Sequence, residues 1–260
     1  MFSKFENLQK YLVQSEKQGI CLAFSGGIDS MLLLYLCKKL NILAVTINSN
    51  LQTDDEISFT KEICNSWNIK QIVLDIDIFQ SPVILSNPKD RCYHCKKMMF
   101  EKVLDTAAQN NCAIIFDGTN FDDLKVYRPG RKALEELGVV SPFAKFEITK
   151  SEIREYAKEC GIPFYNKPST PCLATRFPYG TKLTPEKLQM VEKGEDILKY
   201  FGFDCCRLRV HDDIARIEIL PEQFGDFIAQ KDEIIKAMKT LGLKYITLDI
   251  EGFRSGSMDL

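Results

Sequence analysis

A short apolar strand pattern that breaks into a Ser-Gly-Gly turn constrains the fold of this chain more than any other feature. Residues 20–24 read Ile-Cys-Leu-Ala-Phe, residues 25–30 read Ser-Gly-Gly-Ile-Asp-Ser, and a helical pattern follows over 30–40. Gly26 and Gly27 can adopt backbone angles closed to other residues and leave main-chain N–H groups open to an anion. The following helix adds unpaired N–H groups and a positive dipole end. We therefore expect the phosphates of ATP here, although the glycines alone would also suit an ordinary strand-to-helix turn.

The residues of this turn also indicate which bond of ATP is broken. A Walker phosphate loop has the pattern Gly-x-x-x-x-Gly-Lys-Ser/Thr, and the missing lysine argues against phosphoryl transfer. Release of pyrophosphate as the leaving group fits better. Residues 25–30 resemble the SGGxDS signature of the PP-loop ATP pyrophosphatases, and this resemblance implies adenylation of a carboxylate or a base.

Strand-like and helical patterns alternate through the first two-thirds of the chain. The strand-like runs lie at 20–24, 43–47, 72–74 and 113–116, and the helical runs lie at 30–40, 55–66 and 90–109. Such alternation predicts an α/β fold, a Rossmann-like parallel sheet with helices on both faces and ligands at the carboxyl ends of the strands. Because Asp117-Gly118-Thr119-Asn120 follows the last of these strands, we expect Gly118 in a second wall of the nucleotide site. Asp-Gly is also a common turn.

A second, smaller domain is expected after a segment rich in proline and small residues. Thr149 and Glu152 form a capping-box pattern for one more helix, and the proline-rich connection follows over 166–180. We expect a PP-loop domain over 1–170 and a substrate-binding and oligomerisation domain over 171–260. The patterns predicted for this small α+β domain are a helix at 185–201, strands at 205–210 and 214–219, helices within 221–240 and a strand at 245–250.

Composition limits the classes of protein to which the chain can belong. Of its 260 residues, 45% are hydrophobic and 27% are charged, which suits a globular fold with a substantial core. The longest apolar run is far too short to span a bilayer, so no membrane partner is expected and we assign the chain to the cytoplasm. A net charge of −2 counts against a nucleic acid partner. Ten cysteines in such a compartment are expected to be reduced thiols.

Three of these cysteines stand in settings that favour chemistry. Cys92 and Cys95 lie one turn apart near the start of a predicted helix, where the helix N-terminus and neighbouring basic residues would stabilise thiolates. Cys172 is flanked by prolines. Three thiolates suit an iron–sulfur cubane with one iron left open, which can hold extra sulfide. His94 could complete a tetrahedral zinc site, but its offset from Cys92 points it off the shared face. The pair of cysteines would also suit a redox dithiol, or two thiols that are merely packed together.

A candidate anion site lies in the second half. Residues 205–211 alternate, so Arg207 and Arg209 face one side and suit bidentate binding of a phosphate or carboxylate. Arg216 and Glu218 share a face on the next strand. The alternative is a solvated hairpin face with cross-strand Arg/Glu pairs.

A carboxylate also interrupts an apolar stripe nearby. In the helix predicted over 185–201, Leu188, Val191, Glu195 and Leu198 fall on one side. Because buried acids are usually paired or functional, we expect a role for Glu195, although it could also lie at the rim of the stripe.

Several motifs together resemble one family over essentially the whole chain. These are Ser25–Ser30, Asp117–Asn120, Tyr127–Gly130, Lys167–Ser169, Pro171–Gly180, Arg207–His211 and Gly252–Gly256. The chain resembles the LarE family, PP-loop sulfur transferases that help to make the nickel-pincer nucleotide cofactor of lactate racemase.

This resemblance implies a reaction and roles for particular residues. ATP would adenylate a carboxylate of a pyridinium dicarboxylate mononucleotide, pyrophosphate would leave, and a sulfur nucleophile would displace AMP to give a thiocarboxylate. Arg207 and Arg209 would hold the substrate phosphate, and Arg176 matches a basic position of the family's site. The residues matching the acidic positions of that site are Glu195, Glu218 and Asp226. The residues expected to hold the ATP phosphates and Mg²⁺ are Ser25, Gly26, Gly27, Asp29 and Ser30.

The resemblance leaves the sulfur source open between two routes. Some members of the family sacrifice the sulfur of one cysteine, at the place of Cys172, and become dehydroalanine. Others carry a 4Fe–4S cluster on three cysteines, and its unique iron binds a sulfide for transfer. Because Cys92 and Cys95 accompany Cys172, we favour the cluster route, supplied by a separate sulfide source. Relatives form hexamers, so the resemblance also implies a homo-oligomer.

Three other functions are compatible with parts of the sequence. A tRNA thiolase would share the PP-loop and three cysteines, but the likeness covers only the first two-thirds of the chain. An amidating enzyme that uses ammonia would need no thiols. A nucleotide-binding regulator would bind ATP without releasing pyrophosphate.

Overall fold

The chain forms two compact units. The computed structural model describes residues 2–51, 54–126, 128–162, 171–254 and 257–258. One unit contains Met1–Ile78 and Asp90–Thr170, and the other contains Phe79–Lys89 and Pro171–Leu260. One boundary between the units falls after residue 170, and no sequence pattern predicts the excursion of Phe79–Lys89 into the second unit.

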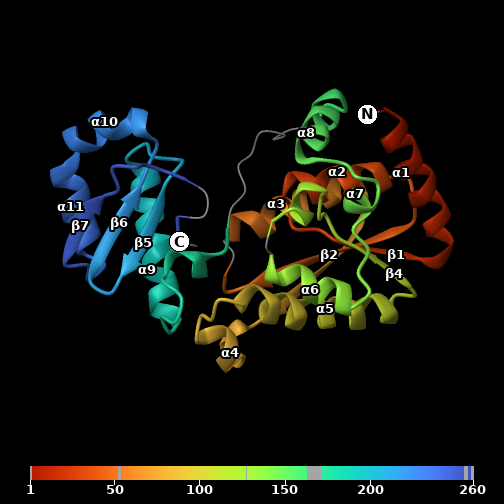
Figure 1. Ribbon diagram of the computed structural model, residues 1–260, viewed down its shortest axis with the longest axis horizontal. Coiled ribbons are helices and arrows are strands. Elements are labelled where there is room, and N and C mark those ends of the chain that lie inside the picture. The colour runs from red at the N-terminus through yellow and green to blue at the C-terminus, as the bar shows by residue number, and fades with distance from the viewer. Residues whose placement is uncertain (1, 52–53, 127, 163–170, 255–256, 259–260) are drawn as a thin grey trace. The chain divides into compact units, whose positions relative to one another are not determined.

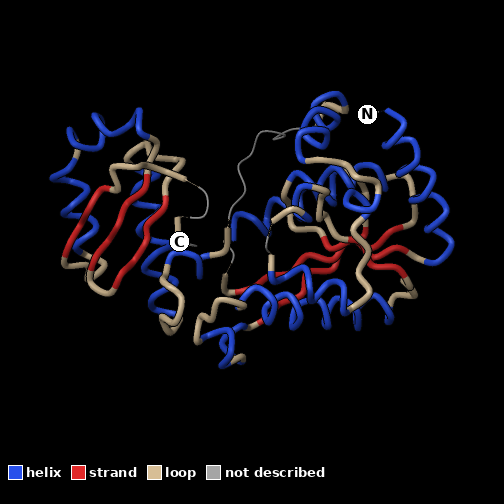
Figure 2. The backbone as a smooth tube through the Cα atoms, viewed as in Figure 1, coloured by secondary structure: helices blue, strands red, loops and turns tan. Residues whose placement is uncertain are grey.

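The first unit is built on a parallel sheet of four strands in the order β3-β2-β1-β4. The strands are β1 Ile20–Ala23, β2 Ile42–Ser49, β3 Lys70–Ile76 and β4 Ile114–Phe116. The helices are α1 Phe2–Ser15, α2 Ile28–Cys37, α3 Asp54–Ser66, α5 Arg91–Gln109, α6 Pro129–Glu136, α7 Pro142–Lys145 and α8 Lys150–Glu159. Figures 1 and 2 show helices on both faces of this sheet, which confirms the predicted Rossmann-like α/β fold.

Alternating side chains of the central strand divide the core of this unit into two layers. Ile20 and Leu22 pack into a buried cluster with residues of α1, α2 and α8, whereas Cys21 packs on the other face with residues of α5 and α6. Successive residues of a strand point to opposite faces, so both faces of β1 must be apolar. The continuous apolar run in the sequence is the result.

Residues 79–89 belong to the second unit because their backbone pairs with it. The amide of Gly180 donates to the carbonyl oxygen of Asn87, and the amide of Leu183 donates to that of Leu85. The side chain of Asn87 is fully buried and donates to the carbonyl oxygen of Pro178 at 2.8 Å. The short helix α4 (Pro82–Leu85) lies in this segment.

The second unit is a small α+β fold. Strands β5 (Arg207–His211) and β6 (Ile214–Glu218) pair antiparallel, and β7 (Tyr245–Leu248) pairs parallel with β6. The helices are α9 Pro185–Tyr200, α10 Phe224–Ala229 and α11 Lys231–Lys239. Each predicted strand and helix of this domain is confirmed, and the pattern over 221–240 resolves into two helices after a 3-10 turn.

Some sequence motifs fall outside the described residues. Lys167-Pro168-Ser169, Tyr127 and the Ser255-Gly256 pair are among them. Within the described ranges, none of the helices combines the length and the apolar character that a membrane span requires.

Candidate functional site

The Ser-Gly-Gly turn lies between the end of β1 and the start of α2. Gly26 has φ of 75°, a left-handed conformation that a side chain would strain. The Ser30 hydroxyl donates to the carbonyl oxygen of Gly27 at 3.0 Å and accepts from the amide of Ser25 at 3.3 Å, so one side chain fixes both sides of the turn. Ser25 and Gly27 are exposed. The turn therefore presents its backbone and the N-terminus of α2 to solvent, as an anion site requires.

Gly118 forms the other side of this turn. A Cβ atom added to Gly118 would lie 2.8 Å from the backbone nitrogen of Ser30 and 3.3 Å from the carbonyl carbon of Asp29. This close approach arises because β4 pairs parallel with β1, so the carboxyl ends of both strands meet at one edge. The buried carboxylate of Asp117 holds the loop in place by accepting from the hydroxyls of Thr119 and Ser141.

Asp29 and a lysine that the sequence patterns did not single out form an ion pair beside the turn. Lys150 Nζ lies 2.7 Å from Asp29 Oδ1, and the side-chain amide of Asn120 donates to Asp29 Oδ2 at 3.3 Å. Burial raises the pKa of Asp29, although the ammonium of Lys150 and the amide of Asn120 oppose that rise. Lys150 follows the predicted N-cap Thr149, so the capping box, confirmed in the structure, is the only sequence signal for its position.

We expect Gly118→Ala to weaken ATP binding. The new methyl group would clash with backbone atoms of Ser30, so the N-terminus of α2 must shift. A strain of about 1–3 kcal/mol corresponds to a loss of affinity of about 5- to 150-fold. The measurement is calorimetric titration with a non-hydrolysable ATP analogue and Mg²⁺. Gly225→Ala is the matched control, because Gly225 is exposed in α10 and its Cβ would meet nothing within 4 Å. Equal affinities of the two variants would refute the close-approach argument.

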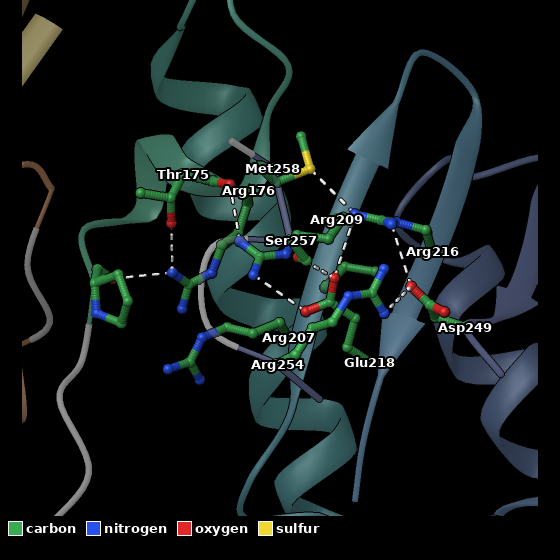
Figure 3. A network of polar contacts seen from close by, with 12 residues as sticks. Thr175, Arg176, Arg207, Arg209, Arg216, Glu218, Asp249, Arg254, Ser257 and Met258 are labelled. Atoms are coloured by element: carbon green, nitrogen blue, oxygen red, sulfur yellow. Dashed lines mark hydrogen bonds and ion pairs between the residues drawn. The ribbon is translucent and has the colours of Figure 1, made fainter. Parts of the chain in front are cut away.

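The two arginines of β5 differ in their surroundings. Arg209 is buried, lies 3.1 Å from the fully buried carboxylate of Glu218, and donates to the carbonyl oxygen of Thr175 at 2.9 Å. Arg207 is half-buried with its guanidinium 4.9 Å from the ring centre of Phe253. The alternative of a solvated hairpin face is therefore wrong for Arg209 and Glu218, which Figure 3 shows inside a polar network.

This network continues across the three-stranded sheet. Arg216 lies 3.2 Å from Glu218 and 3.1 Å from Asp249, and the hydroxyl of Ser257 donates to Glu218. Within the described part of the chain, the Nε atoms of Arg209 and Arg216 are buried without a hydrogen-bond partner. Two unused donors in a buried cationic cluster could both bind an anion. Asp226, by contrast, is exposed in the first turn of α10.

Arg176 and Glu195 form a buried bidentate ion pair. Nε and Nη2 of Arg176 lie 2.7 and 2.9 Å from the two carboxylate oxygens of Glu195, and Glu195 also accepts from the amide of Leu208. The prediction that Glu195 lies in the buried stripe of α9 is confirmed. Arg176 also donates to the carbonyl oxygens of Pro171 at 2.9 Å and Cys172 at 3.4 Å. The pair thereby fixes the backbone on which the Cys172 thiol is carried.

Breaking this pair should cost far more stability than breaking an exposed one. We expect Glu195→Leu to lower the free energy of unfolding by about 3–5 kcal/mol, since it leaves the Arg176 charge buried and unpaired. Asp196→Leu on the exposed side of α9, where Asp196 pairs with Lys199, should cost only about 0–1 kcal/mol. Chemical denaturation measures both. Adding Arg176→Met to Glu195→Leu should restore part of the loss, and a double variant as unstable as the sum of both singles would contradict the coupling.

The predicted cysteine pair lies at the start of α5. Cys92 is exposed and Cys95 is half-buried, one turn apart in the first unit. Gly130 of α6 approaches α5 so closely that an added Cβ would lie 2.9 Å from Lys96 Cγ and 3.1 Å from the Cys92 carbonyl oxygen. Cys172 is half-buried and belongs to the second unit. Among the described residues there is no group of three or more His, Cys, Asp or Glu side chains arranged to hold a metal ion.

Comparison with known proteins identifies a family and relatives of this chain. The profile of the PP-loop domain family matches residues 2–174. Over 93% of the chain and 89% of the relative, the sequence is 37% identical to the pyridinium-3,5-bisthiocarboxylic acid mononucleotide synthase of Lactiplantibacillus plantarum.

The chain belongs to the LarE family of PP-loop sulfur transferases. Two further relatives extend the likeness to other organisms. The uncharacterized protein slr1717 of Synechocystis sp. is 34% identical over 99% of this chain and 97% of its own length. The uncharacterized protein MJ0830 of Methanocaldococcus jannaschii is 36% identical over 97% of this chain and 96% of its own. The likeness to the L. plantarum synthase covers 93% of the chain and therefore includes residues of both units.

Proposed function

We propose that this enzyme adenylates a carboxylate of pyridinium-3,5-biscarboxylic acid mononucleotide and then inserts sulfur to give a thiocarboxylate. The observation that carries the proposal is the likeness to the L. plantarum synthase, which spans both units. The substrate carboxylate attacks the α-phosphorus of ATP, and pyrophosphate leaves with the electrons of the broken P–O bond. A sulfur nucleophile then attacks the acyl carbon, and AMP leaves with the electrons of the C–O bond. Adenylation is needed because carboxylate oxygen is a poor leaving group.

The exposed turn of the first unit supports the ATP half of this proposal. Ser25 and Gly27 are exposed beside the N-terminus of α2, where phosphate is favoured, and Gly26 and the Ser30 hydroxyl set the shape of the turn. Asp29 supplies carboxylate oxygens of the type that Mg²⁺ prefers. Mg²⁺ bound there would neutralise charge on the departing pyrophosphate.

The arginines of the second unit support the substrate half. Arg207 is half-buried and Arg209 carries a buried unused donor, so both are suited to the substrate phosphate. The exposed carboxylate of Asp226 is available to a ligand in the same unit. Arg176 and Glu195 contribute by holding the backbone of Cys172, since each is bound to the other in the interior. Glu218 has the same supporting relation to Arg209.

The thiols supply sulfur by one of two routes. The three cysteines fit a 4Fe–4S cluster in donor type, with Cys92 and Cys95 on one helical turn, and the open iron of such a cluster would carry a sulfide. The alternative is that Cys172 itself gives up its sulfur by elimination and becomes dehydroalanine. We favour the first route because the pair at α5 has no task in the second.

The working form is inferred from the same family resemblance. We infer a homo-hexamer in the cytoplasm, where ten thiols stay reduced and a separate sulfide source reloads the enzyme. We disfavour the tRNA thiolase alternative because the likeness to the L. plantarum synthase is 37% identity over 93% of the chain.

The two half-reactions should separate in a Cys172→Ala variant. Pyrophosphate release that depends on the pyridinium dicarboxylate mononucleotide should persist, because adenylation precedes the step that needs sulfur, while the thiocarboxylate product is lost. Coupled pyrophosphate detection and mass spectrometry of the product measure the two steps. Cys205→Ala, another half-buried cysteine of the second unit, should keep both. Pyrophosphate release without that substrate would rule out the proposed acyl acceptor, and unchanged thiocarboxylate formation by Cys172→Ala would exclude Cys172 from the sulfur-transfer step.

A second measurement separates the sulfur routes. Protein reconstituted anaerobically with iron and sulfide should be brown, and Cys92→Ala, Cys95→Ala or Cys172→Ala should each abolish the colour while Cys205→Ala retains it. Loss of H₂S from Cys172 after one turnover, seen as a mass change of the intact protein, would instead establish the sacrificial route.

A further inference from the structure

Lys150 occupies an electrostatically unfavourable position. It is the first residue of α8, where the positive end of the helix dipole disfavours a cation. Thr149 caps this helix and Asp122 accepts from the Lys150 backbone amide at 2.9 Å, so the residue is fixed at the helix start. The cost of placing an ammonium there is offset by Asp29, 2.7 Å away. A lysine held at this cost, beside the phosphate-binding turn, points to a functional role.

Asp29, the partner of Lys150, can exchange the lysine ammonium for another cation. Asp29 lies in the first turn of α2 and is one-fifth exposed, so a ligand at the turn can reach it. Its two oxygens are taken by Lys150 and Asn120. A divalent cation that binds this carboxylate competes directly with the ammonium, because both use the same oxygen atoms.

An ammonium displaced from Asp29 has an obvious new partner. The exposed Ser25 and Gly27 of the turn, where we place the phosphates, are separated from Asp29 by only a few residues. Lys150 is one-third exposed and its side chain is long and flexible, so its head group can turn toward the anion. This lysine would take the place of the one that a Walker loop carries and this turn lacks.

We propose that Lys150 binds the leaving pyrophosphate: it pairs with Asp29 when the site is empty and moves to the phosphates when Mg²⁺ occupies Asp29. The proposal rests on the ATP half of the proposed function. Lys150 takes part through its charge alone, and no covalent bond to it forms or breaks. Its charge stabilises the negative charge that develops on the β-phosphate as the α–β bond breaks. A lysine with a purely structural role, by contrast, would only join α8 to α2.

The test uses inorganic pyrophosphate in the presence of a metal chelator, so that neither Mg²⁺ nor the acyl substrate takes part. In Asp29→Asn the competing carboxylate charge is gone, and we expect pyrophosphate to bind more tightly than to the wild type. Adding Lys150→Met should weaken that binding by about 10- to 100-fold, as expected for losing a hydrogen bond to a charged group. Adding Lys158→Met, which removes an exposed lysine from the other end of α8, should leave it unchanged. Titration calorimetry gives the affinities, and thermal unfolding checks that each variant is folded.

Two results would overturn the proposal. One is equal pyrophosphate affinity of Asp29→Asn/Lys150→Met and Asp29→Asn/Lys158→Met. The other is an Asp29→Asn protein that binds pyrophosphate no better than the wild type. Because neither measurement involves the thiols or the pyridinium substrate, failure here is distinct from failure of the proposed sulfur transfer.

Discussion

The contact on which the nucleotide site depends is the approach of Gly118 to the N-terminus of α2. Two parallel neighbours, β1 and β4, bring their carboxyl ends to one edge, and only a residue without a side chain can then pass the backbone of Ser30. This contact places Asn120 beside Asp29, and Lys150 reaches the same carboxylate from α8. The apolar side chains on both faces of β1 hold the sheet in place, because they pack against helices on each side.

The second unit contains several charged side chains in its interior. The buried arginines Arg176 and Arg209 are paired with Glu195 and Glu218, and the half-buried Arg216 also lies beside Glu218. Desolvating such groups is costly unless their hydrogen-bonding capacity is nearly filled. Within the described residues, the buried arginine donors of this cluster that remain without a hydrogen-bond partner are the Nε atoms of Arg209 and Arg216 and Nη1 of Arg254.

Most of the architecture was predictable because it follows from local patterns. Alternation of strand and helix identifies the parallel sheet, Thr149 and Glu152 identify the start of α8, and the stripe containing Glu195 identifies its burial. Lys150 was missed because an ion pair between residues 121 positions apart leaves no periodicity in the sequence. The burial of Arg209 was underestimated for a related reason: a strand pattern shows which residues share a face and is silent about what covers that face. How Cys92 and Cys95 relate to Cys172 likewise depends on pairing between units, which no local pattern encodes.

The excursion of Phe79–Lys89 has a consequence for how the chain can be divided. Because this segment supplies Asn87 and the backbone partners of Gly180 and Leu183, the polypeptide crosses between the units three times rather than once. A fragment starting at residue 171 would lack Phe79–Lys89, which belongs to the second unit. A fragment ending at residue 170 would contain that segment without Gly180 and Leu183, with which its backbone pairs. Neither half is a self-sufficient module, so shuffling them between relatives would have to exchange two pieces of sequence together.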